Sequence, residues 1–272
     1  MIQYPHCKIN LGLSIVSKRP DGFHELETVF YPIALKDILE ITPISNQETT
    51  KFSHSGLHIP GESNNNLCLK AYQLLKKDFP LIPEIQMHLH KIIPMGAGLG
   101  GGSSDGTFAL IILNSLFKLG LSKDQLFMYA EKLGSDCPYF LFNSPCHATG
   151  KGEILSPIQL DLSNFQFVFI HPGIHIATPW AFQQIVPCEK NILIRDIIQQ
   201  PIQTWKQHLI NDFEAPVIKS HPIIGALKND LYQQGAIYAS MSGSGSSLFG
   251  IFEKGKQFLK SELTKNIRID II

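Results

Sequence analysis

The sequence predicts an α+β protein of two lobes, and three observations support this expectation. A length of 272 residues lies near the upper end for one domain and suits two smaller ones. Segments with the apolar periodicity of strands and of helices alternate in both halves of the chain. A glycine-rich loop leads directly into an apolar helix pattern near the middle. We expect an N-terminal domain over residues 1–155 and a C-terminal domain over residues 156–272.

The predicted elements follow from local patterns. Residues 8–16 alternate apolar with small or polar side chains, as a half-buried strand does, and a Pro-Asp-Gly turn follows at 20–22. Further strands are expected at 26–33, 37–42, 84–94, 166–170, 236–241 and 247–252. Helices are expected at 64–79 with Asn65 or Asn66 as N-cap, at 103–120 with Ser103 and Ser104 as capping residues, and at 122–134 with Ser122 as its cap. Further helices are expected at 178–186, 204–211, 222–231 and 256–264.

The composition narrows the classes of function. Lys+Arg and Asp+Glu both number 23, so the formal net charge of zero argues against broad binding to nucleic acid or to an acidic membrane. The five cysteines form no CxxC pair and are typical of reduced thiols. We find no signal-peptide pattern, and the most apolar stretch, residues 108–117, is about half the length that spans a bilayer. We expect a cytoplasmic protein with no nucleic-acid or membrane partner.

Five glycines lie between Gly96 and Gly102, directly before the predicted helix. Glycine permits positive φ and a close approach of backbone N–H groups, and a helix N-terminus favours an anion. These properties predict a cradle for a nucleotide phosphate. A flexible hinge is the alternative, although a hinge does not need to open a capped apolar helix.

Two known phosphate motifs fit this loop poorly. A Walker A loop requires a lysine after its last glycine, where this chain has Ser103. Residues 96–101, GAGLGG, match the dinucleotide fingerprint G-x-G-x-x-G. Two successive helices are expected after them, however, rather than a helix, a strand and an acidic residue.

The loop and four other segments together carry a family resemblance. Residues 94–104, PMGAGLGGGSS, resemble the second motif of the GHMP kinases, and 241–250, MSGSGSSLFG, resemble the third. Residues 8–33, which contain RPDGFHEL, are similar to the first motif of one branch of that family. Residues 133–141 resemble its catalytic-aspartate segment and 171–182 its substrate segment. The resemblance implies an N-terminal ribosomal-protein-S5-domain-2-like lobe and a C-terminal ferredoxin-like lobe.

The same resemblance implies an activity. The chain would transfer the γ-phosphate of ATP, with Mg²⁺, to the 2-hydroxyl of a cytidine-diphosphate-linked methylerythritol in the non-mevalonate isoprenoid pathway. The small-molecule substrate is the only partner implied; the Mg²⁺ ligands and the choice between monomer and homodimer stay open. Two alternatives are another GHMP small-alcohol kinase, such as a homoserine kinase, and a nucleotide-binding sensor without turnover.

The resemblance also implies roles for particular residues. Asp136 matches the catalytic aspartate and Lys8 its partner lysine. A carboxylate in reach of a hydroxyl can orient or deprotonate it, and an ammonium nearby keeps that carboxylate ionised and offsets phosphoryl charge. The implied ATP-binding residues are Pro94, Met95, Gly96, Ala97, Gly98, Leu99, Gly100, Gly101, Gly102, Ser103, Ser104, Asn66 and Lys91. The implied substrate-binding residues are Asn10, Phe23, His24, Phe30, Thr178, Phe182, Gly243 and Ser244, with His24 bonding to the cytosine edge and Phe23 and Phe182 sandwiching its ring.

Simpler interpretations remain for several of these residues. Lys8 and Asp136 could form a plain salt bridge, and the three phenylalanines could pack in the core. Outside the motifs, His88 and His90 share a strand face but lack an evident third metal ligand, so solvent-facing histidines are favoured. Cys137 adjoins Asp136, and without an identifiable base it is interpreted as a packed thiol. Two departures from the family stand out: Phe23 replaces the usual tyrosine, and Gly106 replaces a helix-favouring alanine.

Overall fold

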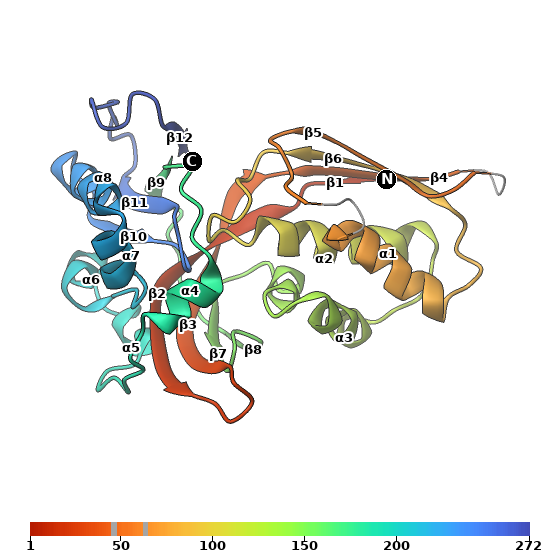
Figure 1. The fold of residues 1–272 in the computed structure, drawn as a ribbon, viewed down its shortest axis with the longest axis horizontal. Coiled ribbons are helices and arrows are strands. Elements are labelled where there is room, and N and C mark those ends of the chain that lie inside the picture. The colour runs from red at the N-terminus through yellow and green to blue at the C-terminus, as the bar shows by residue number, and fades with distance from the viewer. Residues whose placement is uncertain (45–47, 62–64) are drawn as a thin grey trace. The chain divides into compact units, whose positions relative to one another are not determined.

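A computed structural model describes residues 1–44, 48–61 and 65–272 (Figure 1). The chain forms two compact units. Unit 1 comprises residues 1–7, 33–95 and 100–143, and unit 2 comprises residues 8–32, 96–99 and 144–272. The units therefore differ from two contiguous segments divided at residue 155. The chain enters unit 2 twice before residue 144, at residues 8–32 and at the loop residues 96–99, and both stretches belong with the C-terminal half.

Unit 1 consists of a four-stranded sheet covered by helices. The strand order is β1-β4-β6-β5, with β5 parallel to β6 and the other pairs antiparallel. Its strands are β1 (Ile2–Gln3), β4 (Ile38–Pro43), β5 (Lys51–Gly56) and β6 (Ile85–Lys91). Its helices are α1 (Leu67–Asp78), α2 (Gly101–Leu116) and α3 (Lys123–Leu133), followed by a 3₁₀ helix, Cys137–Leu141. Helices α1 and α2 lie on the same side of the sheet (Figure 1).

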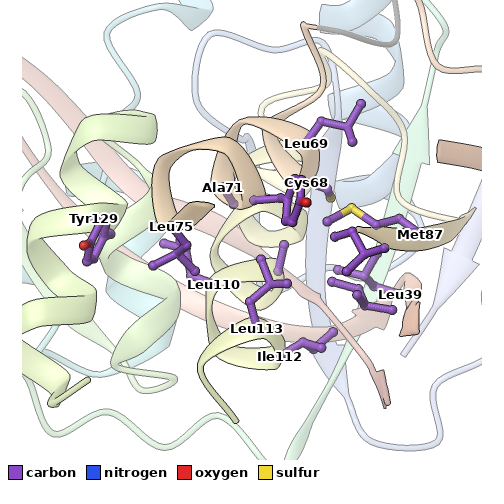
Figure 2. Close-up of a cluster of buried hydrophobic side chains, with 14 of the residues drawn as sticks. Leu39, Cys68, Leu69, Ala71, Leu75, Met87, Leu110, Ile112, Leu113 and Tyr129 are labelled. Carbon is purple, nitrogen blue, oxygen red and sulfur yellow. The ribbon is translucent and has the colours of Figure 1, made fainter. Parts of the chain in front are cut away.

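The core of unit 1 lies between this sheet and its helices. Strand alternation turns Leu39 and Met87 toward α1 and α2, where Leu110 and Leu113 are fully buried. Figure 2 shows these side chains together, with Tyr129 of α3 at the edge of the cluster. The packing of the helices on this sheet therefore follows from two features: the alternation of apolar residues on the strands and the near-continuous apolar face of α2.

Gly106 has a packing reason. A Cβ added at Gly106 would lie 2.7 Å from Cβ of Leu67, the first residue of α1. The glycine lets the two helices approach more closely than alanine would, and this contact accounts for the departure from the residue usual in the family.

Two of the three predicted helix caps in unit 1 are confirmed and one is wrong. Asn66 caps α1 by accepting a hydrogen bond from the backbone N–H of Cys68, and Ser122 forms a capping box with Gln125 at α3, so both predictions are confirmed. The prediction that Ser103 and Ser104 cap α2 is wrong. The helix already begins at Gly101, because Gly100 adopts a left-handed φ of 69° that turns the chain into the helix.

Unit 2 contains two four-stranded sheets, ordered β2-β3-β7-β8 and β10-β11-β9-β12. The strands of the first are β2 (His6–Lys18), β3 (His24–Lys36), β7 (Cys146–Thr149) and β8 (Ile154–Pro157). Those of the second are β9 (Phe165–His171), β10 (Tyr238–Met241), β11 (Leu248–Glu253) and β12 (Arg268–Ile271). The helices are α4 (Thr178–Gln183), α5 (Ile194–Ile197), α6 (Ile202–His208), α7 (Glu214–Ser220) and α8 (Pro222–Gln233).

Most predicted elements of the C-terminal half are present, with three differences. The short helices α5 and α7 were not predicted, and neither was the strand β12. The helix predicted at 256–264 is wrong: two of the backbone N–H groups there bond to side chains, and those of Lys256 and Thr264 bond to carbonyls three residues earlier, as in turns. The N–H of Leu259 bonds to Gln234 and that of Ser261 to Thr264, while the Ser261 hydroxyl bonds to Asp230 of α8.

Among the helices that the structure describes, none combines the length and the apolar character needed to cross a membrane.

Candidate active site

The glycine loop has the conformation expected of an anion cradle. Gly96, Gly98 and Gly100 have φ values of 61°, 78° and 69°, all in the left-handed region. At Gly98 the close approach of another segment adds a second requirement, because a Cβ there would lie 1.9 Å from the carbonyl oxygen of Ser242. The alternating left-handed turns leave backbone N–H groups free of a regular ladder just before α2, as a phosphate cradle requires.

A buried ion-pair cluster supports the start of α2 in unit 1. The Lys91 ammonium, at the end of β6, lies 2.5 Å from Oδ2 of Asp37 and 2.7 Å from Oδ2 of Asp105. The second oxygen of Asp37 accepts hydrogen bonds from the backbone N–H groups of Ile92 and Ile93. A Cβ on Gly101 would lie 3.0 Å from the same ammonium. Lys91 is thus packed beneath the first turn of α2.

The burial of this cluster shifts its acid–base equilibria. Burial raises the pKa of Asp105 to about 8, against the opposing effect of the Lys91 ammonium and with a further rise from the Asp37 carboxylate. Burial by itself lowers the pKa of Lys91, but the two carboxylates outweigh it and the pKa is raised. The Lys91 ammonium therefore stays charged. Because that side chain is fully buried, its placement favours support of the loop over direct contact with a nucleotide.

A cavity of about 160 Å³ lies in unit 1 beside the loop. Asn66 and Met95, both expected at the ATP site, line it together with Gly102 and Asp105. The rest of the lining combines apolar with a few polar side chains: Phe52, His54, Ile59, Pro60, Gly61, Asn65, Leu67 and Leu89. This mixture suits a flat heterocyclic base that also has polar edges.

Asp136 is tied to α2 within unit 1. It is half-buried and immediately precedes the 3₁₀ helix at Cys137–Leu141. The hydroxyl of Thr107, which is completely buried, bonds to the carbonyl oxygen of Cys137 and to that of Ser103, both at 2.9 Å. One side chain therefore fixes the carboxylate-bearing turn relative to the first turn of the loop helix.

Lys8 and Asn10 form a second polar group, on β2 in unit 2. The Lys8 ammonium donates to Oδ1 of Asn10 at 2.7 Å and lies 4.6 Å from the ring centroid of Phe30. Asn10 Nδ2 donates to the Thr28 hydroxyl at 3.0 Å. The backbone N–H of Lys8 bonds to the carbonyl of Leu99 in the glycine loop. All of these side chains are buried, so the ammonium is held in place before any ligand binds.

The segment at 241–247 joins this group. The Ser242 hydroxyl donates to the Gly98 carbonyl at 2.8 Å and accepts from the backbone N–H of Asn10 at 3.3 Å. Ser244 and Thr178, both expected at the substrate site, have their hydroxyl oxygens 3.1 Å apart. Residues from four distant stretches of sequence therefore meet within unit 2.

The aromatic residues are only partly arranged as expected. His24 stacks on Phe182 with ring centroids 4.8 Å apart and an interplanar angle of 17°. Phe182 also meets Phe213 edge-on at 4.9 Å. Phe23 is 57% exposed, and the Lys151 ammonium lies 4.6 Å from its ring centroid. The structure thus brings His24 and Phe182 together, while Phe23 stacks with a cation instead.

Cys137 and the histidine pair His88 and His90 lie in environments that fit structural roles. Burial raises the pKa of the Cys137 thiol to about 11, which fits a packed thiol and not a nucleophilic thiolate. The ring nitrogens of His88 bond to the hydroxyls of Ser53 and Ser55, and Ser55 also bonds to His90. Within the ranges that the structure describes, no group of three or more His, Cys, Asp or Glu side chains could hold a metal ion.

The sequence analysis did not identify Asp37, Asp105 and Thr107. The first two pair with the buried Lys91, and Thr107 bonds to the backbone beside Asp136. One signal was available: a lysine at the end of a buried strand requires a buried countercharge, and Asp105 lies in the adjacent predicted helix. Asp37 and Thr107 carry no such signal, because Asp37 pairs with Lys91 and Thr107 reaches the carbonyl of Cys137, both of which are distant in sequence.

Comparisons with known proteins identify the family of the chain. The model of the GHMP kinases N terminal domain matches residues 66–144, and that of the GHMP kinases C terminal domain matches residues 194–268. The 4-diphosphocytidyl-2-C-methyl-D-erythritol kinase of Bacteroides thetaiotaomicron is 53% identical over 255 residues, which are 93% of this chain and 92% of the relative. The enzyme of the same name from Cytophaga hutchinsonii is 49% identical over 269 residues, 98% of each chain.

Solved structures agree as well. A crystal structure of 4-(cytidine 5'-diphospho)-2C-methyl-D-erythritol kinase has a TM-score of 0.79 at 31% identity and covers 92% of this chain and 90% of its own. Homoserine kinase from Cytophaga hutchinsonii, with a TM-score of 0.65 at 15% identity over 98% of this chain and 94% of its own, shares the fold. The mixed α and β content and the GHMP resemblance expected from sequence are confirmed. The chain belongs to the GHMP kinases, and among them to the family of 4-diphosphocytidyl-2-C-methyl-D-erythritol kinases.

Proposed function

We propose that this chain transfers the γ-phosphate of ATP to the 2-hydroxyl of 4-diphosphocytidyl-2-C-methyl-D-erythritol. The observation that carries the proposal is the left-handed glycine loop opening onto α2, with Asp136 tied to the same helix through Thr107. A helix N-terminus that can bind phosphate, and a carboxylate tied to that same helix within unit 1, are what phosphoryl transfer to an alcohol requires.

The residues would divide the work as follows. The backbone N–H groups of residues 96–104 and the N-terminus of α2 hold the phosphates, and the cavity beside Asn66 receives the base. Asp136 orients the attacking hydroxyl and accepts its proton, while Lys8 offsets charge on the transferred group. Asn10 holds the Lys8 ammonium at 2.7 Å, which limits the reorganisation needed during the reaction.

The Mg²⁺ that accompanies ATP would be held by phosphate oxygens and water, since this ion usually keeps several waters. It would supply neutralisation of phosphate charge. The five free cysteines suit a reducing compartment, and we propose a cytoplasmic location.

We assign binding of the alcohol substrate to residues other than those that bind ATP. His24 with Phe182 would recognise the cytosine, and Thr178 with Ser244 would lie along the polar remainder of the substrate. Cytosine binding would use the stacking surface that His24 and Phe182 already present. A homoserine kinase has no cytosine to bind, so this aromatic pair favours the cytidine-linked alcohol.

The test measures ADP release with the cytidine-linked alcohol and, in parallel, with homoserine. We expect turnover with the first only, and no ADP above background with it would refute the proposal. Asp136→Asn should lower kcat by about two orders of magnitude or more while the Kd for ATP stays near normal, as loss of an acid–base group does. Lys8→Met should lower kcat as well. Undiminished turnover in Asp136→Asn would remove this carboxylate from the mechanism.

A further inference from the structure

The segment 241–247, which we call the third glycine segment, cannot set its own shape. It joins β10 to β11 and contains Gly243 and Gly245 with φ values of 55° and 92°. Glycines in such conformations have many alternatives in the unfolded chain and gain no side-chain packing. Yet this segment touches both the glycine loop and Asn10 through Ser242. Its position must therefore be fixed from outside.

Asn211 supplies that restraint. Its Nδ2 donates two hydrogen bonds, to the carbonyl oxygens of Met241 and Gly243, each at 2.8 Å. Its Oδ1 accepts from the backbone N–H of Phe213 at 3.0 Å. The side chain is 1% exposed, so water does not compete for these bonds. Both donors and the acceptor of the amide are used, which fixes its orientation.

Asn211 is also anchored to β2, the strand that carries Lys8 and Asn10. It forms an isolated parallel bridge with Leu13. The N–H of Leu13 bonds to the carbonyl of Ile210, and the N–H of Asp212 bonds to the carbonyl of Leu13. The amide therefore connects the strand of the ammonium group with the third glycine segment, within unit 2 alone.

A continuous hydrogen-bond path follows from these contacts. It runs from Asn211 to the Met241 and Gly243 carbonyls, along the backbone to Ser242, and from Ser242 to Asn10 and the Gly98 carbonyl. Asn10 then holds the Lys8 ammonium. Displacement of the segment would move the glycine loop and the ammonium together. Misplacement of reacting groups by about 1 Å can cost 10²-fold in rate.

We propose that Asn211 is a positioning residue for phosphoryl transfer, acting through the third glycine segment. The inference rests on the proposed function. Asn211 needs no contact with either substrate, and its effect is on the rate of the bound complex and not on the occupancy of the ATP site.

The principal test is Asn211→Asp. The carboxylate keeps the size of the amide but faces two carbonyl oxygens without a donor. Asn114→Asp is the matched control, because Asn114 clamps a loop in the same manner: its Nδ2 donates to the carbonyl of Leu121, and its Oδ1 accepts from the N–H of the same residue. Asn114 lies near the far end of α2 from the glycine loop.

Both variants are assayed well below their melting temperatures, and kcat is divided by the number of ATP sites per chain measured by calorimetry. A structural defect lowers that number, whereas misplacement lowers the normalised kcat. We expect about a tenfold or larger loss in Asn211→Asp, a change below about twofold in Asn114→Asp, and little change in the Kd for ATP in either. A normalised kcat within about twofold of wild type in Asn211→Asp overturns the inference.

Two further variants keep the inference testable if Asn211→Asp does not fold. Asn211→Ala removes the two donated bonds without adding a charge. Ser242→Ala leaves Asn211 in place and cuts the link to Gly98 and Asn10, so wild-type turnover there also overturns the inference. Failure of the proposed function is a separate result: wild-type chain that binds ATP but does not phosphorylate the cytidine-linked alcohol.

Discussion

Ser242 and Gly98 lie in direct contact although 144 residues separate them: the Ser242 side-chain hydroxyl donates a hydrogen bond to the Gly98 carbonyl oxygen at 2.8 Å. The contact holds the glycine loop against the third glycine segment within unit 2. It also explains why residue 98 must be glycine for two independent reasons, since φ is 78° and a Cβ would lie 1.9 Å from the Ser242 carbonyl oxygen.

Two glycine substitutions, one at Gly98 and one at a control position, separate the need for positive φ from the need for space. Gly98→Ala should lower kcat by about tenfold or more, because the loop must move away from Ser242 to admit the methyl group. Gly120→Ala is the control: φ there is 71°, but no atom lies within 4 Å of the added Cβ. That variant should lose only the cost of left-handed backbone, about 1–2 kcal/mol, and keep its kcat. Steady-state kinetics and urea unfolding of both variants measure the two effects, and equal kcat in the two would contradict the steric argument.

The loop shows what sequence could and could not predict. Its need for positive φ could be predicted from glycine spacing, since conformation at Gly96 and Gly98 is a local property. The partner of Gly98 could not, because the approach of Ser242 depends on tertiary packing between distant segments. The same limit applies to Asn211, whose sequence neighbourhood gives no sign that its amide reaches residues 241 and 243.

Local patterns failed where side chains compete with the backbone. Residues 256–264 have helical apolar spacing, yet Gln234 and Thr264 accept the N–H bonds that a helix would use. At α2 the prediction placed the start at Ser103, because serine is a common cap, whereas the left-handed turn at Gly100 starts the helix at Gly101. Pairing of a cap residue with its helix is a local rule, and the left-handed backbone of Gly100 overrides it here.

The stacked pair His24 and Phe182 predicts the pocket for the cytidine substrate. His24→Ala removes a ring 4.8 Å from that of Phe182 together with its hydrogen-bonding nitrogens. We expect the KM for the cytidine-linked alcohol to rise about tenfold and the KM for ATP to stay within about twofold, since the lost contacts are to one substrate. His88→Ala, on the sheet of unit 1, should leave both KM values unchanged. A loss of ATP affinity in His24→Ala would show that the two pockets are wrongly assigned.

The buried cluster of Asp105, Lys91 and Asp37 predicts a dependence of stability on pH. Burial raises the pKa of Asp105 to about 8, from about 3.9 in an unfolded chain. The folded state therefore holds this proton more tightly than the unfolded state does. The stabilisation is complete below the unfolded pKa and is lost as pH rises through the folded pKa, at up to about 1.4 kcal/mol per pH unit for one proton.

Asp105→Asn tests this prediction because the amide cannot ionise. Its oxygen can still accept a hydrogen bond from the Lys91 ammonium, which in the wild type lies 2.7 Å from Oδ2 of Asp105. The free energy of unfolding is measured by urea titration of the variant and the wild type at several pH values from 5 to 9. The value for the variant should increase relative to that of the wild type as pH rises toward about 8. Asp124→Asn, at an exposed position in the first turn of α3, is the control and should show no such trend across this range. A difference between Asp105→Asn and the wild type that stays constant with pH would mean that Asp105 is ionised throughout, with Lys91 neutralising it despite the burial.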